Sequence, residues 1–206
     1  MSYEFRNTLA ILFTIVLPLL ILYLKGNWRL RTVVLCLLSL PPLWYLTYAP
    51  LHELSHVAGT YLVGGTVVDY KLIPRFWLGE FGRAWITTNG LPYDWHQLVC
   101  TSAPYIFDLL CLGLSIRILR QGLSKSPFVI GLVFMFLCLR PAFDFVCETL
   151  AFLMNDKGDI YHICQLSGDL FTWSFILFSL GLSAISIATV LIRFRRETAS
   201  SASAAT

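Results

Sequence analysis

The stretch LRTVVLCLLSLPPLWYLTYAPLHELSHVAGTYLV, residues 30–63, decides the fold of this chain. Among its 34 residues, only Arg31 and Glu53 carry a formal charge at neutral pH. As one straight helix it would be about 51 Å long, whereas the hydrocarbon core of a bilayer is about 30 Å thick. The Pro41-Pro42 pair inside the stretch predicts a break or a strong kink. We therefore predict a kinked membrane-spanning helix over residues 30–63.

The composition of the whole chain supports a location in the membrane. Of its 206 residues, 57% are hydrophobic and 13% are charged, and the mean hydropathy is +0.71. Soluble domains are typically about 45–50% apolar and about 25% charged. So few charges cannot cover an ordinary globular surface, which predicts an integral, multi-pass membrane protein. Four further apolar runs are long enough to cross a bilayer: residues 8–24, 98–119, 127–154 and 170–194.

These runs predict an all-α polytopic membrane protein with about five transmembrane helices in a single transmembrane domain, residues 1–197. Between the second and third spans, residues 64–95 hold two pieces rich in β-branched and aromatic residues, 66–73 and 82–88, separated by Gly, Pro and Asn. Such a pattern predicts strands. We expect a small membrane-associated β-hairpin region there. The Ser- and Ala-rich tail, residues 198–206, is predicted to be disordered.

The distribution of Lys and Arg predicts the orientation of the chain. Five spans place the two termini on opposite sides of the membrane. The segments on the side of the C-terminus hold nine Lys and Arg residues, and the segments on the opposite side hold five. Because cytosolic segments are enriched in positive charge, the C-terminus is predicted to be cytosolic.

Ionisable side chains inside an apolar span are energetically costly, so each of them is a candidate functional residue. Away from their ends, the apolar runs contain seven such residues: His52, Glu53, His56, Asp108, Arg140, Asp144 and Glu148. Arg140 and Glu148 flank Asp144 along one helix, and we expect them to form a salt bridge that compensates buried charge.

Three of these residues form the motif His52-Glu53-Leu54-Ser55-His56. Positions i and i+4 lie on one face of a helix, so the two imidazoles can bind one metal ion. Glu53, one residue away from His52, can reach a water molecule on that ion. This HExxH pattern meets the requirements of zinc-assisted hydrolysis: two nitrogen ligands, an open position and a nearby base.

Two histidines and a water leave one protein ligand to be found. Asp108 and Asp144 are both candidates, because each follows a proline in a span, where a freed carbonyl and a loosened helix can admit polar chemistry. The residue types alone do not choose between them. His96 and His162 are further candidates near span ends. The acidic segment 155–159 is expected to be an ordinary solvated loop.

On these motifs the chain resembles the site-2-type intramembrane zinc metalloproteases. His52 to His56 matches their HExxH motif, and Ala103-Pro104 followed by Asp108 looks like a degenerate form of their second motif. The resemblance implies a zinc metalloendopeptidase that binds one Zn²⁺ per chain. It also implies Asp144 as the third ligand, with Asp108 as the reserve, and Glu53 as the catalytic residue.

The implied function is the hydrolysis of peptide bonds in membrane-embedded or membrane-adjacent protein substrates. The expected partners are therefore a membrane-protein substrate and the lipid bilayer. Nucleic acid is not expected, because no basic patch is interleaved with exposed aromatic residues. One alternative is a non-hydrolytic metal-binding membrane protein, either a transporter or a scaffold. Another is a zinc peptidase that acts on peptides at the membrane surface.

Overall fold

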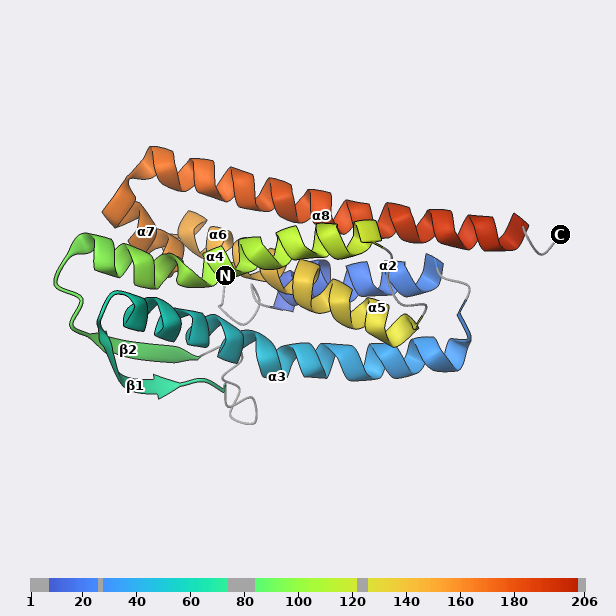
Figure 1. Ribbon diagram of the computed structural model, residues 1–206, viewed down its shortest axis with the longest axis horizontal. Helices are drawn as coiled ribbons and strands as arrows, with labels where there is room; N and C mark the ends of the chain where they lie inside the picture. The colour runs from blue at the N-terminus through green and yellow to red at the C-terminus, as the bar shows by residue number, and fades with distance from the viewer. Residues whose placement is uncertain (1–7, 26–27, 74–83, 122–125, 204–206) are drawn as a thin grey trace.

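A computed structural model describes residues 8–25, 28–73, 84–121 and 126–203. Within these residues the chain is mostly helical, and the helices run along the long axis of the molecule (Figure 1). The elements in chain order are a π-helical turn η1 (Leu12–Val16), α2 (Leu17–Lys25), α3 (Leu30–Leu62), β1 (Thr66–Lys71), β2 (Trp85–Asn89), α4 (Asp94–Gln121), α5 (Pro127–Phe134), a π-helical turn η3 (Met135–Leu139), α6 (Arg140–Leu153), α7 (Asp159–Ser167) and α8 (Asp169–Ser203).

Five helical segments are long and apolar enough to cross a membrane, as the sequence predicts. They are Thr8–Lys25, Leu30–Leu62, Asp94–Ile118, Pro127–Leu153 and Asp169–Ile192. The hairpin and α7 lie at one end of the bundle, and the C-terminus of α8 lies at the other (Figure 1). We call the first of these the hairpin end. The orientation across a bilayer stays a prediction.

Helix α3 is continuous over its 33 residues and includes Pro41, Pro42 and Pro50. Of the predicted break or strong kink at Pro41-Pro42, the break is therefore absent, and the kink stays a prediction. A proline removes one backbone hydrogen bond and does not by itself end a helix in a membrane, where neighbouring helices support the chain. Because the helix is unbroken, α3 carries the HExxH motif toward the hairpin end.

The predicted β region is a two-stranded antiparallel sheet. Thr66 of β1 pairs with Asn89 of β2, and Lys71 pairs with Trp85, with a register irregularity between Val67 and Asp69. The sheet lies beside the C-terminal half of α3 (Figure 1). The connecting residues 74–83, which include the start of the predicted second strand, lie outside the described residues.

Two tight contacts hold α3 in the bundle. At its middle, the buried Trp44 stacks on Tyr48 with ring centroids 4.8 Å apart, and Phe143 of α6 packs edge-on against both rings. Near its C-terminal end, Gly59 allows close approach of α4, because a Cβ atom at Gly59 would lie 2.8 Å from the Cβ of Ala103. These contacts fix the position of the histidines, which lie between them in α3.

Two helical features differ from the sequence expectation. Residues 159–167, which lie between the fourth and fifth predicted spans, form α7, whose buried Ile160, Ile163 and Cys164 follow helical spacing. Residues 198–203, predicted to be disordered, continue α8, since Ala and Ser are compatible with an existing helix. Residues 204–206 lie outside the described residues.

Candidate metal centre

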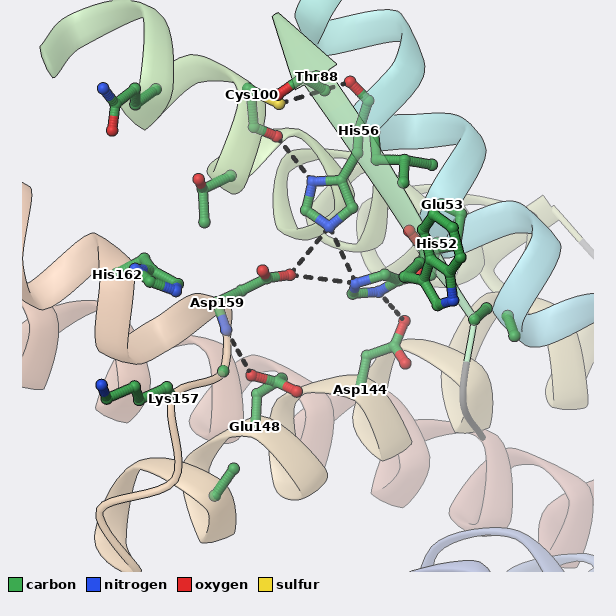
Figure 2. A pocket seen from close by; sticks show the side chains of 18 of the residues that line it. His52, Glu53, His56, Thr88, Cys100, Asp144, Glu148, Lys157, Asp159 and His162 are labelled. Atoms are coloured by element: carbon green, nitrogen blue, oxygen red, sulfur yellow. Dashed lines mark hydrogen bonds and ion pairs between the residues drawn. The ribbon is translucent and has the colours of Figure 1, made fainter. Parts of the chain in front are cut away.

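The two histidines of the motif face the same side of α3. The Nε2 atoms of His52 and His56 are 3.2 Å apart, and their rings meet edge to face. This is the result expected from i, i+4 spacing on a helix. Both side chains point into the interior between α3, α6 and α7 (Figure 2).

A third side chain completes a cluster with these two nitrogens. Asp159 is the first residue of α7, and its Oδ2 lies 3.2 Å from Nε2 of His52 and 2.9 Å from Nε2 of His56. The three atoms thus form a nearly regular triangle with edges of 2.9–3.2 Å (Figure 2). Among the described residues, this is the group of His, Cys, Asp and Glu side chains that could hold a metal ion. We call it the metal cluster.

The other nitrogen of each imidazole contacts a hydrogen-bond acceptor. Nδ1 of His56 lies 2.9 Å from the backbone carbonyl oxygen of Cys100, and Nδ1 of His52 lies 3.4 Å from Oδ2 of Asp144. A carbonyl can only accept, so His56 must donate from Nδ1, and the Asp144 carboxylate favours the same tautomer of His52. In the neutral imidazoles both Nε2 atoms then present lone pairs to one another and to the Asp159 carboxylate.

The charge on Asp159 is maintained by its neighbours. Burial by itself raises the pKa of this carboxyl, but when the two imidazoles are protonated, the charges and hydrogen bonds of His56 and His52 outweigh burial and hold the pKa below its usual range. The hydroxyl of the fully buried Tyr105 also donates to Oδ2 of Asp159 at 3.4 Å. Asp159 is therefore an ionised oxygen donor at neutral pH.

The position of Asp159 depends on α6. Its backbone N–H, at the start of α7, donates to Oε2 of Glu148 at 3.0 Å. A free N–H group at a helix start needs such a partner. Gly158 leaves room for this bond, because a Cβ atom there would collide with the Glu148 carboxylate. Glu148 thus caps α7, rather than forming the salt bridge with Arg140 that we expected.

A second charged group lies beside the metal cluster. The guanidinium of Arg140 donates to Oδ1 of Asp108 and, at 3.3 Å, to Oδ2 of Asp144, and it lies over the ring of Phe107. Arg140 is 1% exposed, Asp108 0% and Asp144 5%. We call Arg140, Asp108 and Asp144 the ion triad. It touches the metal cluster through the contact between Asp144 and His52.

Glu53 and the metal cluster line a cavity of about 980 Å³. Glu53 follows His52 in α3 and is 8% exposed. The same cavity is lined by β2, including Ile86, Thr88 and Asn89, and by the loop that precedes α7. Thr88, His56 and Cys100, which all line this cavity, are labelled in Figure 2. The metal cluster is thus accessible from the hairpin end and is bordered there by a β-strand.

The structure brings together most of the residues that the sequence singles out, with one change. His52, Glu53, His56 and Asp144 all line the cavity, but Asp144 contacts Nδ1 of His52, whereas the cluster forms at Nε2. Asp108, the reserve, is held by Arg140, and within the described part of the chain it forms no hydrogen bond with either histidine. The carboxylate that meets the two Nε2 atoms is that of Asp159, from a segment interpreted as a solvated loop.

The two remaining histidines do not join the cluster. His96 lies at the start of α4, with its ring against Tyr93 and Trp95. His162 lines the cavity one turn after Asp159. A sequence signal for Asp159 exists: the helical spacing of Ile160, Ile163 and Cys164 would have predicted α7 and placed Asp159 at its first turn.

Comparison of the chain with family models, with curated proteins and with solved structures found no match. The functional argument therefore depends on the geometry of the cluster and on the chemistry of its residues.

Proposed function

We propose that this protein is an intramembrane zinc metallopeptidase that hydrolyses peptide bonds of membrane-embedded or membrane-adjacent proteins. One observation carries the proposal: two imidazole nitrogens and a carboxylate oxygen converge within 3.2 Å of one another. Three lone-pair atoms at this separation repel each other unless a cation, either a proton or a metal ion, lies between them. An accessible cavity and a separate carboxylate adjoin them.

The donor set fits zinc in number, type and spacing. Catalytic zinc sites commonly use three protein ligands, often two His and one carboxylate, and leave the fourth position to water or substrate. With bonds of about 2.0–2.1 Å, two ligands of a tetrahedral zinc ion are about 3.3 Å apart. The observed edges of 2.9–3.2 Å are close to that value. His52, His56 and Asp159 would hold the ion.

Zinc in such a site supplies Lewis acidity, which makes a water molecule nucleophilic near neutral pH and polarises the scissile carbonyl. Glu53 is suited to the proton transfers, because it lines the cavity next to His52 and is not part of the metal cluster. Its carboxylate accepts a proton as the water oxygen bonds to the carbonyl carbon. The same proton then passes to the peptide nitrogen as the C–N bond breaks.

The strand beside the cavity supports an extended peptide as the substrate. In the two-stranded sheet formed by the described residues, β2 pairs with β1 on one edge only. Ile86, Thr88 and Asn89 of β2 line the cavity with the metal cluster. A peptide segment can hydrogen-bond to such an edge by strand addition. A helical substrate hides its peptide bonds, so it would have to unwind locally before this pairing.

The decisive experiment combines zinc content with peptide cleavage by the purified full-length chain in nanodiscs. The probe is a quenched-fluorescent single-span peptide with an Asn-Gly-Pro interruption near the end of the span that lies at the hairpin end. Its control is the same peptide with an uninterrupted leucine segment. We expect about one zinc ion per chain and cleavage of the interrupted peptide. Glu53→Gln should keep the zinc and lose about 100- to 10,000-fold in rate.

Asp69→Asn is a matched control, because it removes an exposed carboxylate from β1, away from the cavity. This variant should retain both zinc and cleavage. Unchanged turnover by Glu53→Gln would overturn the peptidase proposal. Zinc binding without cleavage of either peptide would instead favour the non-hydrolytic alternative, a metal transporter or scaffold.

A further inference from the structure

The ring of His56 is oriented by a backbone carbonyl of α4 that would ordinarily accept a hydrogen bond within its own helix. In an α-helix the carbonyl of residue i accepts the N–H of residue i+4. Cys100 lies in α4, and the residue four positions later is Pro104, which has no N–H. The carbonyl oxygen of Cys100 is therefore free of its helical donor. It accepts Nδ1–H of His56 at 2.9 Å instead.

The carbonyl reaches His56 because α3 and α4 approach each other closely at Gly59. A Cβ atom at Gly59 would lie 2.8 Å from Cβ of Ala103 and 3.1 Å from Cα of Cys100. Real side chains essentially never tolerate the first of these distances, so any larger residue would push the helices apart. Gly59 lies one turn after His56, and Ala103 immediately precedes Pro104. The close approach and the free carbonyl thus occur at the same level of the helix pair.

Further contacts connect the same backbone groups. The thiol of Cys100 donates to the carbonyl of His56 at 3.7 Å, so these two residues exchange hydrogen bonds between the helices. The hydroxyl of Thr60 donates to the His56 carbonyl at 2.8 Å and lies 3.1 Å from Sγ of Cys100. Cys100 and Thr60 are buried, so water does not compete for these groups.

We propose that Pro104 and Gly59 are positioning residues that fix His56 as its Nδ1–H tautomer and thereby present Nε2 to the metal. The proposal rests on the proposed metal site. The two residues act together: Pro104 leaves the Cys100 carbonyl without its helical donor, and Gly59 lets the helices approach closely enough for this carbonyl to reach His56. A hydrogen bond to the second ring nitrogen is known to set the tautomer and orientation of metal-binding histidines, and its loss typically weakens metal binding about 10- to 100-fold.

The first test restores the missing N–H with Pro104→Ala. The new N–H competes for the Cys100 carbonyl, but a carbonyl oxygen has two lone pairs, so the loss should be near the lower limit, about 10-fold in zinc affinity. Pro42→Ala is the matched control: it removes an exposed proline from the interior of α3 and should leave zinc affinity unchanged.

The second test changes the distance between the helices with Gly59→Ala, which should also weaken zinc binding. Ala103→Gly added to this variant removes the facing Cβ and should restore part of the affinity. Gly113→Ala is the control, because a Cβ at Gly113 of α4 meets nothing within 4 Å. Rescue by removal of the facing Cβ would show that the loss comes from the distance between the two helices at this point.

The readout that separates orientation from folding is the ¹⁵N spectrum of the histidines in the metal-free protein, at a pH where the imidazoles are neutral. Wild type should show His56 as the Nδ1–H tautomer, and Pro104→Ala and Gly59→Ala should show a mixture. Assignment uses the chain with His96 and His162 replaced by Gln.

An unchanged tautomer together with an unchanged zinc affinity in both variants would overturn the positioning proposal. Loss of zinc binding in Pro42→Ala and Gly113→Ala equal to that in the test variants would overturn it as well. This spectrum does not depend on hydrolysis. Absence of zinc binding by wild type would therefore refute the proposed function, whereas the tautomer of His56 would still report on the role of Pro104.

Discussion

The metal cluster and the ion triad are neighbours, and both are built from ionisable side chains in an apolar environment, yet they differ in how their charges are satisfied. In the ion triad a guanidinium lies between two carboxylates, so donors meet acceptors and the residues are almost completely buried. In the metal cluster three lone-pair atoms face one another beside a cavity. The comparison indicates that buried ionisable residues mark a candidate ligand site where ligand atoms of several side chains converge beside a cavity, and not where a guanidinium already neutralises the carboxylates.

Asp144 belongs to the ion triad and contacts His52 of the metal cluster, which explains why the two groups are adjacent. Its Oδ2 accepts from Arg140 at 3.3 Å and lies 3.4 Å from Nδ1 of His52. A carboxylate that holds the second nitrogen of a metal-binding histidine orients the ring and makes it a better ligand. Arg140 therefore acts on the cluster indirectly, since it keeps Asp144 charged and in place.

The largest expected effect comes from removing the carboxylate of the metal cluster. Asp159→Ala leaves two histidines and should lose most of its zinc and all measurable peptide cleavage, because a catalytic site needs three protein ligands. Zinc per chain after dialysis, measured by mass spectrometry, checks the prediction. Asp94→Ala is the matched control, since Asp94 is also an acidic residue in the first turn of a helix.

Asp144→Asn distinguishes the two carboxylates in the same assay. The amide oxygen of Asn can still accept from Nδ1 of His52, so we expect zinc affinity to fall only about 10- to 100-fold, as for an orienting residue. If Asp144→Asn lost its zinc and Asp159→Ala kept it, Asp144 would be the third ligand that the family resemblance implies, and the assignment of Asp159 would be wrong.

The sequence predicted the helical membrane architecture, the small sheet and the HExxH residues, because these depend on local patterns. Five long apolar runs and an i, i+4 histidine pair need no tertiary information. The carboxylate of the metal cluster was different. Asp108, Asp144 and Asp159 are chemically identical, and only packing decides that Arg140 neutralises the first two while α7 turns the third toward Nε2.

The role of Glu148 could not be predicted from the sequence either, because it also depends on packing. Its position on the same helix as Arg140 predicts a salt bridge with that residue, but its carboxylate accepts the backbone N–H of Asp159, eleven residues later. Every residue has a backbone carbonyl, and every residue except proline has an N–H group. The residue types therefore do not show that the Cys100 carbonyl and the Asp159 N–H contact side chains of this site. These two backbone groups position two of the three atoms of the metal cluster.

A smaller effect is expected from breaking the ion triad. Arg140→Gln keeps a hydrogen-bonding side chain but leaves the buried Asp108 and Asp144 without a cation, which should lower the free energy of unfolding by about 3–5 kcal/mol. Unfolding of the metal-free protein in mixed micelles measures it. Arg117→Gln, at an exposed position of α4, is the control. Equal stability of the two variants would show that the triad is not an ion network.

The smallest effect is expected at the connection between the two helices that carry the carboxylates. In Gly158→Ala the new Cβ meets the Glu148 carboxylate, which must move away from the N–H of Asp159. That carboxylate is the far end of a flexible side chain, so the loss is one hydrogen bond, about 0.5–1.5 kcal/mol, or about 2- to 10-fold in zinc affinity. A zinc titration measures it, with Gly181→Ala, whose Cβ would meet nothing within 4 Å, as the control.

A double-mutant cycle decides whether this loss passes through Glu148. In a Glu148→Ala background the carboxylate is already gone, so Gly158→Ala should cost no further zinc affinity, and the two single effects should not add. Additive effects would mean that Gly158 acts on the loop before α7 by another route. Non-additivity would instead show that α6 supports the metal cluster through Glu148 as well as through Asp144. Asp144 and Glu148, one turn apart on that helix, would then orient a histidine of α3 and the carboxylate of α7 from one rigid element.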